Sequence, residues 1–166
     1  MEIPTREGEH LRVPAADFVR LREQALRRKV ALFGTGRDQP GLYGIGPNRT
    51  LLGRAVAELA QAPPGAVRGT LSEADLLESV GGGAFVPAHL TGEIVDPRGP
   101  RRRDLALALN GRVAAVGSSF TVLGGERLSM LVPESLLRRG ANRVELFAVS
   151  ATPAGSRLIP LHRARP

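Results

Sequence analysis

The clearest pattern in the chain is an alternation of leucine and alanine ahead of an Asn-Gly dipeptide. Leu105, Leu107 and Leu109 stand at every second position, and residues 112–116 form another apolar run after Asn110-Gly111. Period-two alternation is typical of a strand, and Asn-Gly supplies the two positive-φ positions of a type I′ turn. These residues predict a β-hairpin centred on Asn110-Gly111.

Further apolar runs of strand length follow one another after residue 66. Residues 120–123 and 127–132 are expected to pair across a turn at Gly124-Gly125. Pro160 places the last run at a sheet edge, because proline has no amide hydrogen for a ladder. Several short strands within about a hundred residues predict a mainly β fold, a jelly-roll or Greek-key β-sandwich. The other predicted strands are residues 67–71, 85–95, 142–149 and 157–161.

A helix is predicted over residues 15–33, ahead of the strands. Phe18, Leu21 and Ala25 fall near one side of this helix, while charged residues such as Glu23 face outward. The cluster Arg27-Arg28-Lys29 near its end suits the negative end of the helix dipole. We expect the helix to pack on an edge or one face of the sandwich.

The chain is expected to form one structural domain with three segments. Residues 1–12 show no helical stripe and are assigned to a linker, with a loosely paired strand as the alternative. Residues 13–64 hold the helix and a glycine-rich connection, in which residues 50–60 are predicted as a short helix. Residues 65–166 form the sandwich and include a helical turn over residues 72–80.

The chain is strongly basic. Its 166 residues carry a net charge of +7, with 22 arginines beside the single lysine, and only 4% of them are aromatic. Basic charge favours a nucleic-acid partner, yet single-strand readers interleave basic residues with aromatic stacking platforms, and here the two do not alternate. We therefore expect no nucleic-acid partner. An arginine bias of this kind is typical of codon usage in a GC-rich genome.

Missing residue types and missing runs exclude several classes of protein. The chain has no cysteine, which excludes a disulfide scaffold and a thiol nucleophile. No run approaches the ~20 apolar residues that a membrane-crossing helix needs, and the first residues lack a signal-peptide pattern. We expect no transmembrane segment in this chain.

No catalytic, cofactor-binding or metal-ligating residue is predicted. His10, His89 and His162 lack the spacing of metal ligands, and no serine stands in a Gly-x-Ser-x-Gly motif. Ser118-Ser119 and Ser129 fall in or beside predicted strands, where packing explains them. We therefore expect no cofactor and no metal.

One loop is a candidate for binding anions. Arg98, Arg101, Arg102 and Arg103 lie close together between two predicted strands. Arginine makes bidentate contacts with phosphate and carboxylate groups, so this loop is a candidate contact for an anionic cell-envelope polymer. The alternative is a solvated hairpin tip.

A family resemblance rests on a series of short motifs. They are Leu32-Phe33-Gly34, Tyr43-Gly44-Ile45-Gly46-Pro47 followed by Leu52-Gly53-Arg54, and residues 107–116, 130–134 and 140–149. In this order they resemble the C-terminal tail of bacterial, mostly actinobacterial, membrane-anchored sulfatase-like proteins of the alkaline phosphatase superfamily. The likeness spans roughly residues 13–150. Residues 132–144 are also similar to the jelly-roll modules that accompany many glycoside hydrolases, which is a likeness of fold.

The sulfatase-like resemblance implies a tail on the extracytoplasmic side of the membrane. Hydrolase activity would belong to a preceding domain, because this chain has neither a cysteine nor the Ser-x-Pro-x-Arg motif that carries the nucleophile of true sulfatases. No catalytic residue of that family can therefore be assigned to a position here.

Two functions follow as hypotheses. The first is a non-catalytic accessory domain that positions or stabilises the sulfatase-like catalytic domain, docking through an exposed apolar patch around Phe18, Tyr43 and Leu52. The second is a binding module for carbohydrate or for an anionic cell-envelope polymer.

Overall fold

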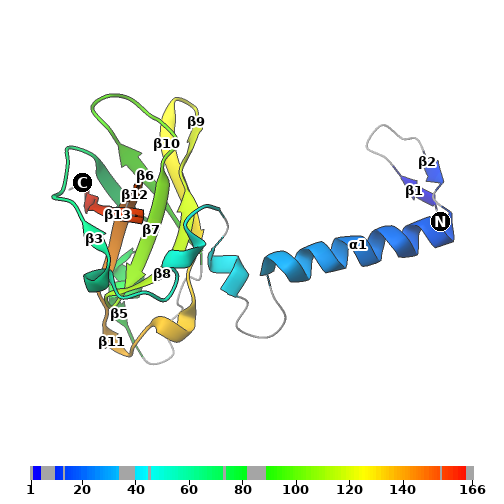
Figure 1. Cartoon of the computed structure of the whole chain (residues 1–166), viewed down its shortest axis with the longest axis horizontal. Coiled ribbons are helices and arrows are strands. Elements are labelled where there is room, and N and C mark those ends of the chain that lie inside the picture. The colour runs from blue at the N-terminus through cyan, green and yellow to red at the C-terminus, as the bar shows by residue number, and fades with distance from the viewer. Residues whose placement is uncertain are drawn as a thin grey trace. The chain divides into compact units, whose positions relative to one another are not determined.

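The chain divides into two compact units, Met1–Gly41 and Leu42–Pro166. The computed structural model describes residues 2–4, 10–12, 14–33, 40–44, 46–72, 74–81, 89–153 and 155–163 (Figure 1). The start of the sandwich is predicted at residue 65 from the sequence. Residues 42–64 belong to the unit that holds the sandwich, because several of their apolar side chains are buried against a sheet.

The first unit contains a two-stranded ladder and one long helix. Strand β1 (Glu2–Pro4) pairs antiparallel with β2 (His10–Arg12), which favours the paired-strand alternative over a linker. Helix α1 (Ala15–Phe33) confirms the predicted helix. Its last turn holds no basic residue, so the expected match between the basic cluster and the helix dipole is wrong. No helix among the described residues is long and apolar enough to cross a membrane.

Two five-stranded sheets form the sandwich of the second unit, which confirms the mainly β prediction (Figure 1). The first sheet has the order β14-β4-β6-β10-β9, and the second has the order β3-β13-β12-β7-β8. Neighbouring strands are antiparallel except for the pairs β3/β13 and β4/β14. The strands of the first sheet are β4 (Arg68–Leu71), β6 (His89–Val95), β9 (Phe120–Val122), β10 (Gly125–Leu131) and β14 (His162–Arg163). Those of the second are β3 (Ala60–Gln61), β7 (Asp104–Leu109), β8 (Arg112–Ser118), β12 (Val144–Thr152) and β13 (Gly155–Pro160).

The hairpin of β7 and β8 is confirmed at its predicted turn. Asn110 and Gly111 both have positive φ, at 52° and 79°, as a type I′ turn requires. The leucines of β7 face the core between the two sheets, where they pack with side chains of the first sheet. This core contains Leu90, Ile94, Leu105, Leu107, Leu109, Leu128, Met130 and Leu146.

The alanines of β7 face the opposite side of the same sheet, where a second core lies. Ala106 and Ala108 pack there with Leu51, Val56 and Leu59 from the segment that crosses this face. Small alanine side chains let this segment approach the sheet closely. Both faces of β7 are therefore buried, which explains why residues 105–109 are apolar without interruption.

The crossing segment is not the short helix predicted over residues 50–60. It contains the 3-10 helices η2 (Arg49–Leu51) and η3 (Val56–Glu58), separated by Gly53 with a φ of 77°. A right-handed helix cannot continue through a residue with positive φ. The segment instead bonds the outer edge of β8, where the Gly53 amide donates to the Val113 carbonyl at 2.8 Å.

Two further expectations are corrected. The second hairpin turns at Leu123-Gly124, with φ of 49° and 77°, one residue earlier than predicted. Strand β13 is not at the edge of its sheet, because β3 pairs with it at Arg157 and Leu158; Pro160 lies beyond that pairing. The remaining elements are α2 (Ala74–Glu78), β5 (Ser79–Val80), β11 (Gly140–Ala141), and the 3-10 helices η1 (Pro40–Tyr43) and η4 (Glu134–Leu136). Residues 85–88 of the strand predicted over 85–95 lie outside the described residues.

Candidate functional site

The arginine loop joins β6 to β7, and its four arginines have different environments. Arg98, Arg101 and Arg102 are exposed. Arg103 is not, because its side chain is only 9% accessible and lies between Asp96 and Glu126, which are 3% and 0% accessible. The predicted anion-contact loop is therefore partly occupied by the protein's own carboxylates.

Arg103 holds both carboxylates at once. Its Nε and Nη2 donate to Glu126 Oε1 and Oε2 at 2.6 and 2.8 Å, and Nη2 also donates to Asp96 Oδ2 at 3.0 Å. The backbone N–H of Arg103 donates to Ser119 Oγ at 2.9 Å, and that of Arg101 donates to Glu126 Oε2 at 3.2 Å. The bidentate contact fixes the loop to β10, so Arg103 has a structural role.

The charges of this cluster stabilise one another. Burial alone would raise the pKa of Glu126, but hydrogen bonds, above all those from Arg103, hold that pKa below its usual value. The backbone N–H of Arg98 and then the Arg103 guanidinium lower the pKa of Asp96. Burial alone would lower the pKa of Arg103, whereas its two carboxylate partners raise it. All three groups are therefore charged near neutral pH.

Arg101 has a weaker tie to the same cluster. Its Nε lies 3.5 Å from Asp96 Oδ2, and the side chain is 60% accessible. An exposed pair of this kind contributes little to stability, so Arg101 can still meet an external anion. Arg98 and Arg102 form no ion pair with any described residue. The anion-contact hypothesis therefore narrows to Arg98, Arg101 and Arg102.

Arg102 borders a groove of about 530 Å³ in the second unit. The groove lies where β8, the last strand of its sheet, faces the part of β10 that extends past β9, and Leu42, Tyr43 and Gly46 form another wall. It is lined by Leu42, Tyr43, Gly46, His89, Arg102, Val116, Gly117, Ser118, Ser129, Met130 and Leu131. These residues come from five separate segments of the sequence, so no short motif predicts the groove.

A histidine and a serine meet at this groove. His89 Nε2 lies 2.8 Å from Ser129 Oγ, and both side chains are exposed. Packing therefore does not explain Ser129, contrary to the sequence-based expectation; packing does explain Ser119, which is buried against the arginine loop. No carboxylate among the described residues contacts His89, so the pair lacks the third group that orients the base in a catalytic triad. The pair can hydrogen-bond a ligand.

No protein-family model, curated protein or solved structure matches this chain. Its function therefore has to be inferred from the chain's own geometry and motifs.

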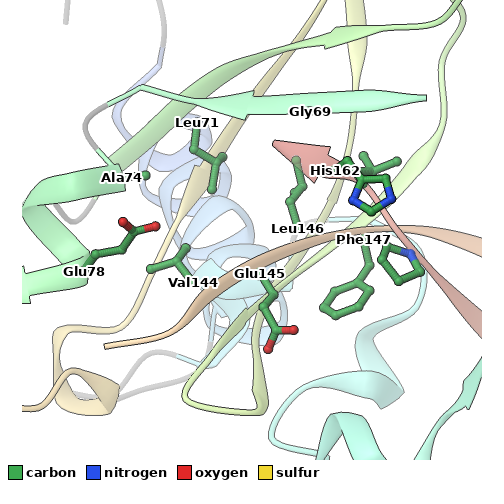
Figure 2. Close-up of a pocket in the computed structure, with 11 residues that line it drawn as sticks. Gly69, Leu71, Ala74, Glu78, Val144, Glu145, Leu146, Phe147 and His162 are labelled. Atoms are coloured by element: carbon green, nitrogen blue, oxygen red, sulfur yellow. The ribbon is translucent and has the colours of Figure 1, made fainter. Parts of the chain in front are cut away.

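A smaller pocket of about 200 Å³ opens between β4, α2, β12 and β14 (Figure 2). Leu71, Ala74 and Leu146 supply apolar lining, while Glu78 and His162 lie on opposite sides of it (Figure 2). Glu145 also lines the pocket and pairs with Arg143 at 2.7 Å. Nowhere in the described ranges, this pocket included, do three metal-ligating side chains gather. Glu78, Glu145 and His162 of the pocket therefore do not form a metal site.

The three residues of the predicted docking patch differ in exposure. Tyr43 and Leu52 are half-buried, Tyr43 against the core between the sheets and Leu52 against the second core. Phe18 belongs to the other unit and is exposed on α1. Packing within the sandwich therefore covers part of the apolar surface of Tyr43 and Leu52.

Proposed function

We propose that this chain is a non-catalytic accessory domain of an outward-facing, membrane-anchored sulfatase-like hydrolase. The family assignment is supported by the order of motifs along residues 13–150. Two of these motifs lie side by side in the fold. The motif at residues 107–116 forms the hairpin of β7 and β8, and Leu52-Gly53-Arg54 belongs to the segment that crosses this hairpin.

The observation that carries the accessory role is the apolar surface of α1. Phe18, Val19, Leu21, Leu26 and Val30 are between 37% and 58% accessible on this one helix. An isolated helix of this length is marginally stable in water, and so is a lone two-stranded ladder. The first unit therefore gains stability when another protein surface covers α1, as the catalytic domain of the proposed parent would.

The polar groups buried in the sandwich support a structural role as well. Ser119, Glu126 and Asn142 are the buried polar residues of the described chain, and each is hydrogen-bonded to a loop backbone or to Arg103. Every buried side-chain N or O atom in the described ranges has a partner. These groups position loops and leave none of their buried atoms free for a reacting molecule.

The DNA sequence upstream of the codon for Met1 tests whether the chain belongs to a sulfatase-like parent protein. We expect the reading frame upstream of Met1 to continue into a hydrolase-like domain preceded by membrane helices. A stop codon and a ribosome-binding site directly before Met1 would contradict the proposal.

Exposure of α1 provides an independent test on the protein. In a polypeptide that includes the preceding domain, amide hydrogen exchange along α1 should be slower than in the isolated chain. The control is β7, whose exchange should be the same in both. Equal exchange of α1 in the two proteins would show that the preceding domain does not cover this helix.

A second function, that of a binding module for carbohydrate or for an anionic polymer, is favoured by one observation. The groove at Arg102 combines a guanidinium that forms no ion pair with any described residue with hydrogen-bonding and apolar side chains. Its ligand chemistry is developed next.

A further inference from the structure

The groove between β8 and β10 is an opening in the side of the sandwich. Strand β9 pairs with β10 only over Gly125–Arg127, so residues 128–131 of β10 have no strand neighbour on that side. Gly46 and Gly117, which carry no side chain, lie in the walls. A ligand can therefore approach close to the backbone here.

The groove carries positive charge without compensation. Arg102 lines it, and none of the described residues that line it is acidic. Elsewhere in the second unit, exposed arginines such as Arg127 and Arg143 are paired with Glu93 and Glu145. Arg102 has no ion pair with any described residue, so its five N–H donors are available to an anion.

The hydrogen-bonding groups lie on the neighbouring strands. His89 on β6 and Ser129 on β10 are joined at 2.8 Å and present further polar atoms to the groove. Ser118 is already engaged, because its Oγ donates to Asp104 Oδ1 at 3.2 Å. Arg102, His89 and Ser129 are thus the groups that can recognise a polar ligand.

The rest of the lining is apolar. Leu42, Tyr43 and Leu131, all half-buried, offer a ring and aliphatic surface next to these polar groups. A few convergent polar groups over a mainly apolar lining are typical of small-molecule sites. The size of about 530 Å³ suits one or two sugar rings rather than a protein segment.

We propose that this groove binds an acidic sugar. The Arg102 guanidinium pairs with the carboxylate through two parallel hydrogen bonds, and His89 and Ser129 bond ring hydroxyls. The apolar C–H face of the sugar packs against the surface that Tyr43 contributes. Nucleic acid fits less well, because its binding depends on several phosphate contacts and the groove offers one unpaired arginine. This site does not depend on the identity of a catalytic partner.

The test is calorimetric titration of the whole chain with trigalacturonate at low ionic strength, with maltotriose as the neutral control. We expect saturable binding of the acidic trisaccharide only. Arg102→Ala should weaken it roughly tenfold to hundredfold, as expected for the loss of a charged hydrogen bond. His89→Ala and Ser129→Ala should each weaken it about threefold to tenfold. Arg102→Lys keeps the positive charge but cannot form the two parallel hydrogen bonds of a guanidinium. Its affinity should therefore lie between those of the wild type and Arg102→Ala.

Arg139→Ala is the control, since it removes an exposed arginine that lies outside both the groove and the arginine loop. It should leave the affinity within twofold, roughly the scatter of a screened surface charge. Equal losses in Arg139→Ala and Arg102→Ala would show unspecific charge attraction and overturn the proposal. So would equal binding of maltotriose, or no saturable binding of trigalacturonate.

A second hollow beside Arg102 is an alternative location for the sugar, and the variants distinguish it from the groove. Arg102 also borders a hollow of about 540 Å³ lined by Val67, Arg101 and Ser150, among others. A loss of affinity in Arg102→Ala with none in His89→Ala or Ser129→Ala would place the sugar there and overturn the assignment to the groove. Thermal unfolding of each variant confirms that the chain is folded. None of these outcomes bears on the gene context that tests the accessory role.

Discussion

Asn110 donates a hydrogen bond from Nδ2 to the Oδ1 of Asn142, 2.8 Å away, and so joins the turn of the β7–β8 hairpin to the loop before β12. Asn142 is itself buried; its Nδ2 donates to the carbonyls of Arg138 and Gly140 at 2.8 and 3.1 Å. Its Oδ1 also accepts from the Arg138 amide at 2.8 Å. One side chain therefore closes this loop and connects it to the hairpin.

Asn142→Ala should destabilise the protein by about 1–3 kcal/mol, because it removes the buried side chain whose hydrogen bonds close the loop and join it to Asn110. Urea unfolding at neutral pH measures the change. Ser156→Ala is the comparison, since Ser156 is only half-buried and its Oγ donates one side-chain bond, to Asn48 Oδ1 at 3.1 Å. A loss in Asn142→Ala no larger than that in Ser156→Ala would argue against this role for Asn142.

Gly111→Val should destabilise the protein by about 1–3 kcal/mol, because a β-branched residue at a φ of 79° is strained. A Cβ added at Gly111 meets nothing within 4 Å, so the cost arises from the backbone alone. The control is Gly65→Val, where a Cβ also meets open space and φ is not positive. That variant should unfold at nearly the wild-type urea concentration, and a similar shift in both would exclude the turn as the cause.

Glu126→Gln should destabilise the protein by about 3 kcal/mol at neutral pH, since it breaks a buried bidentate pair and leaves Arg103 with Asp96 alone. Glu93→Gln is a matched control: Glu93 pairs with Arg127 at the surface of the same sheet, where an ion pair contributes little. Chemical unfolding of both variants measures the difference. Comparable losses would show that burial does not strengthen the Arg103 pair.

Acid should destabilise the protein through the same cluster. The pKa values of Asp96 and Glu126 lie below their usual values in the folded chain, so the unfolded chain binds more protons as the pH falls. Their contribution is fully present above the unfolded pKa values of about 4 and is lost as the pH falls through the lower folded values. Urea midpoints measured from pH 7 to pH 2.5 should fall steeply in that range. In Asp96→Asn/Glu126→Gln the fall should be shallower, and an unchanged slope would exclude these carboxyl groups as its source.

The purified chain should hydrolyse neither 4-nitrophenyl sulfate nor 4-nitrophenyl phosphate, with or without added divalent metal ions. No carboxylate among the described residues contacts His89, so no group there orients the imidazole to activate Ser129 as a nucleophile. Turnover is measured as nitrophenolate release across the fractions of a gel-filtration peak. Activity that follows the protein peak and disappears in Ser129→Ala would contradict the non-catalytic proposal.

The sequence by itself determined the elements whose cause is local. Asn110-Gly111 requires positive φ at two successive residues, so the hairpin followed from the dipeptide and the alternation before it. Helix α1 followed from apolar residues that recur near one side of residues 15–33. Alternation also indicated which residues of β7 share a face, but it did not show that both faces are buried. Ala106 and Ala108 are compatible with a solvent face or with the close crossing segment, and only the packing of Leu51, Val56 and Leu59 distinguishes the two.

Tertiary structure alone decided the roles of the charged and polar residues. Arg103 and Arg102 are adjacent and chemically identical, yet one is buried in ion pairs and the other is exposed at a groove. The difference arises because Glu126, 23 residues away, lies beside Arg103 in the fold. His89 and Ser129 are 40 residues apart and meet because β6 and β10 are neighbours in one sheet. Contacts at such separations depend on strand order and register, which no short motif encodes, whereas turns depend on the backbone preferences of one or two residues.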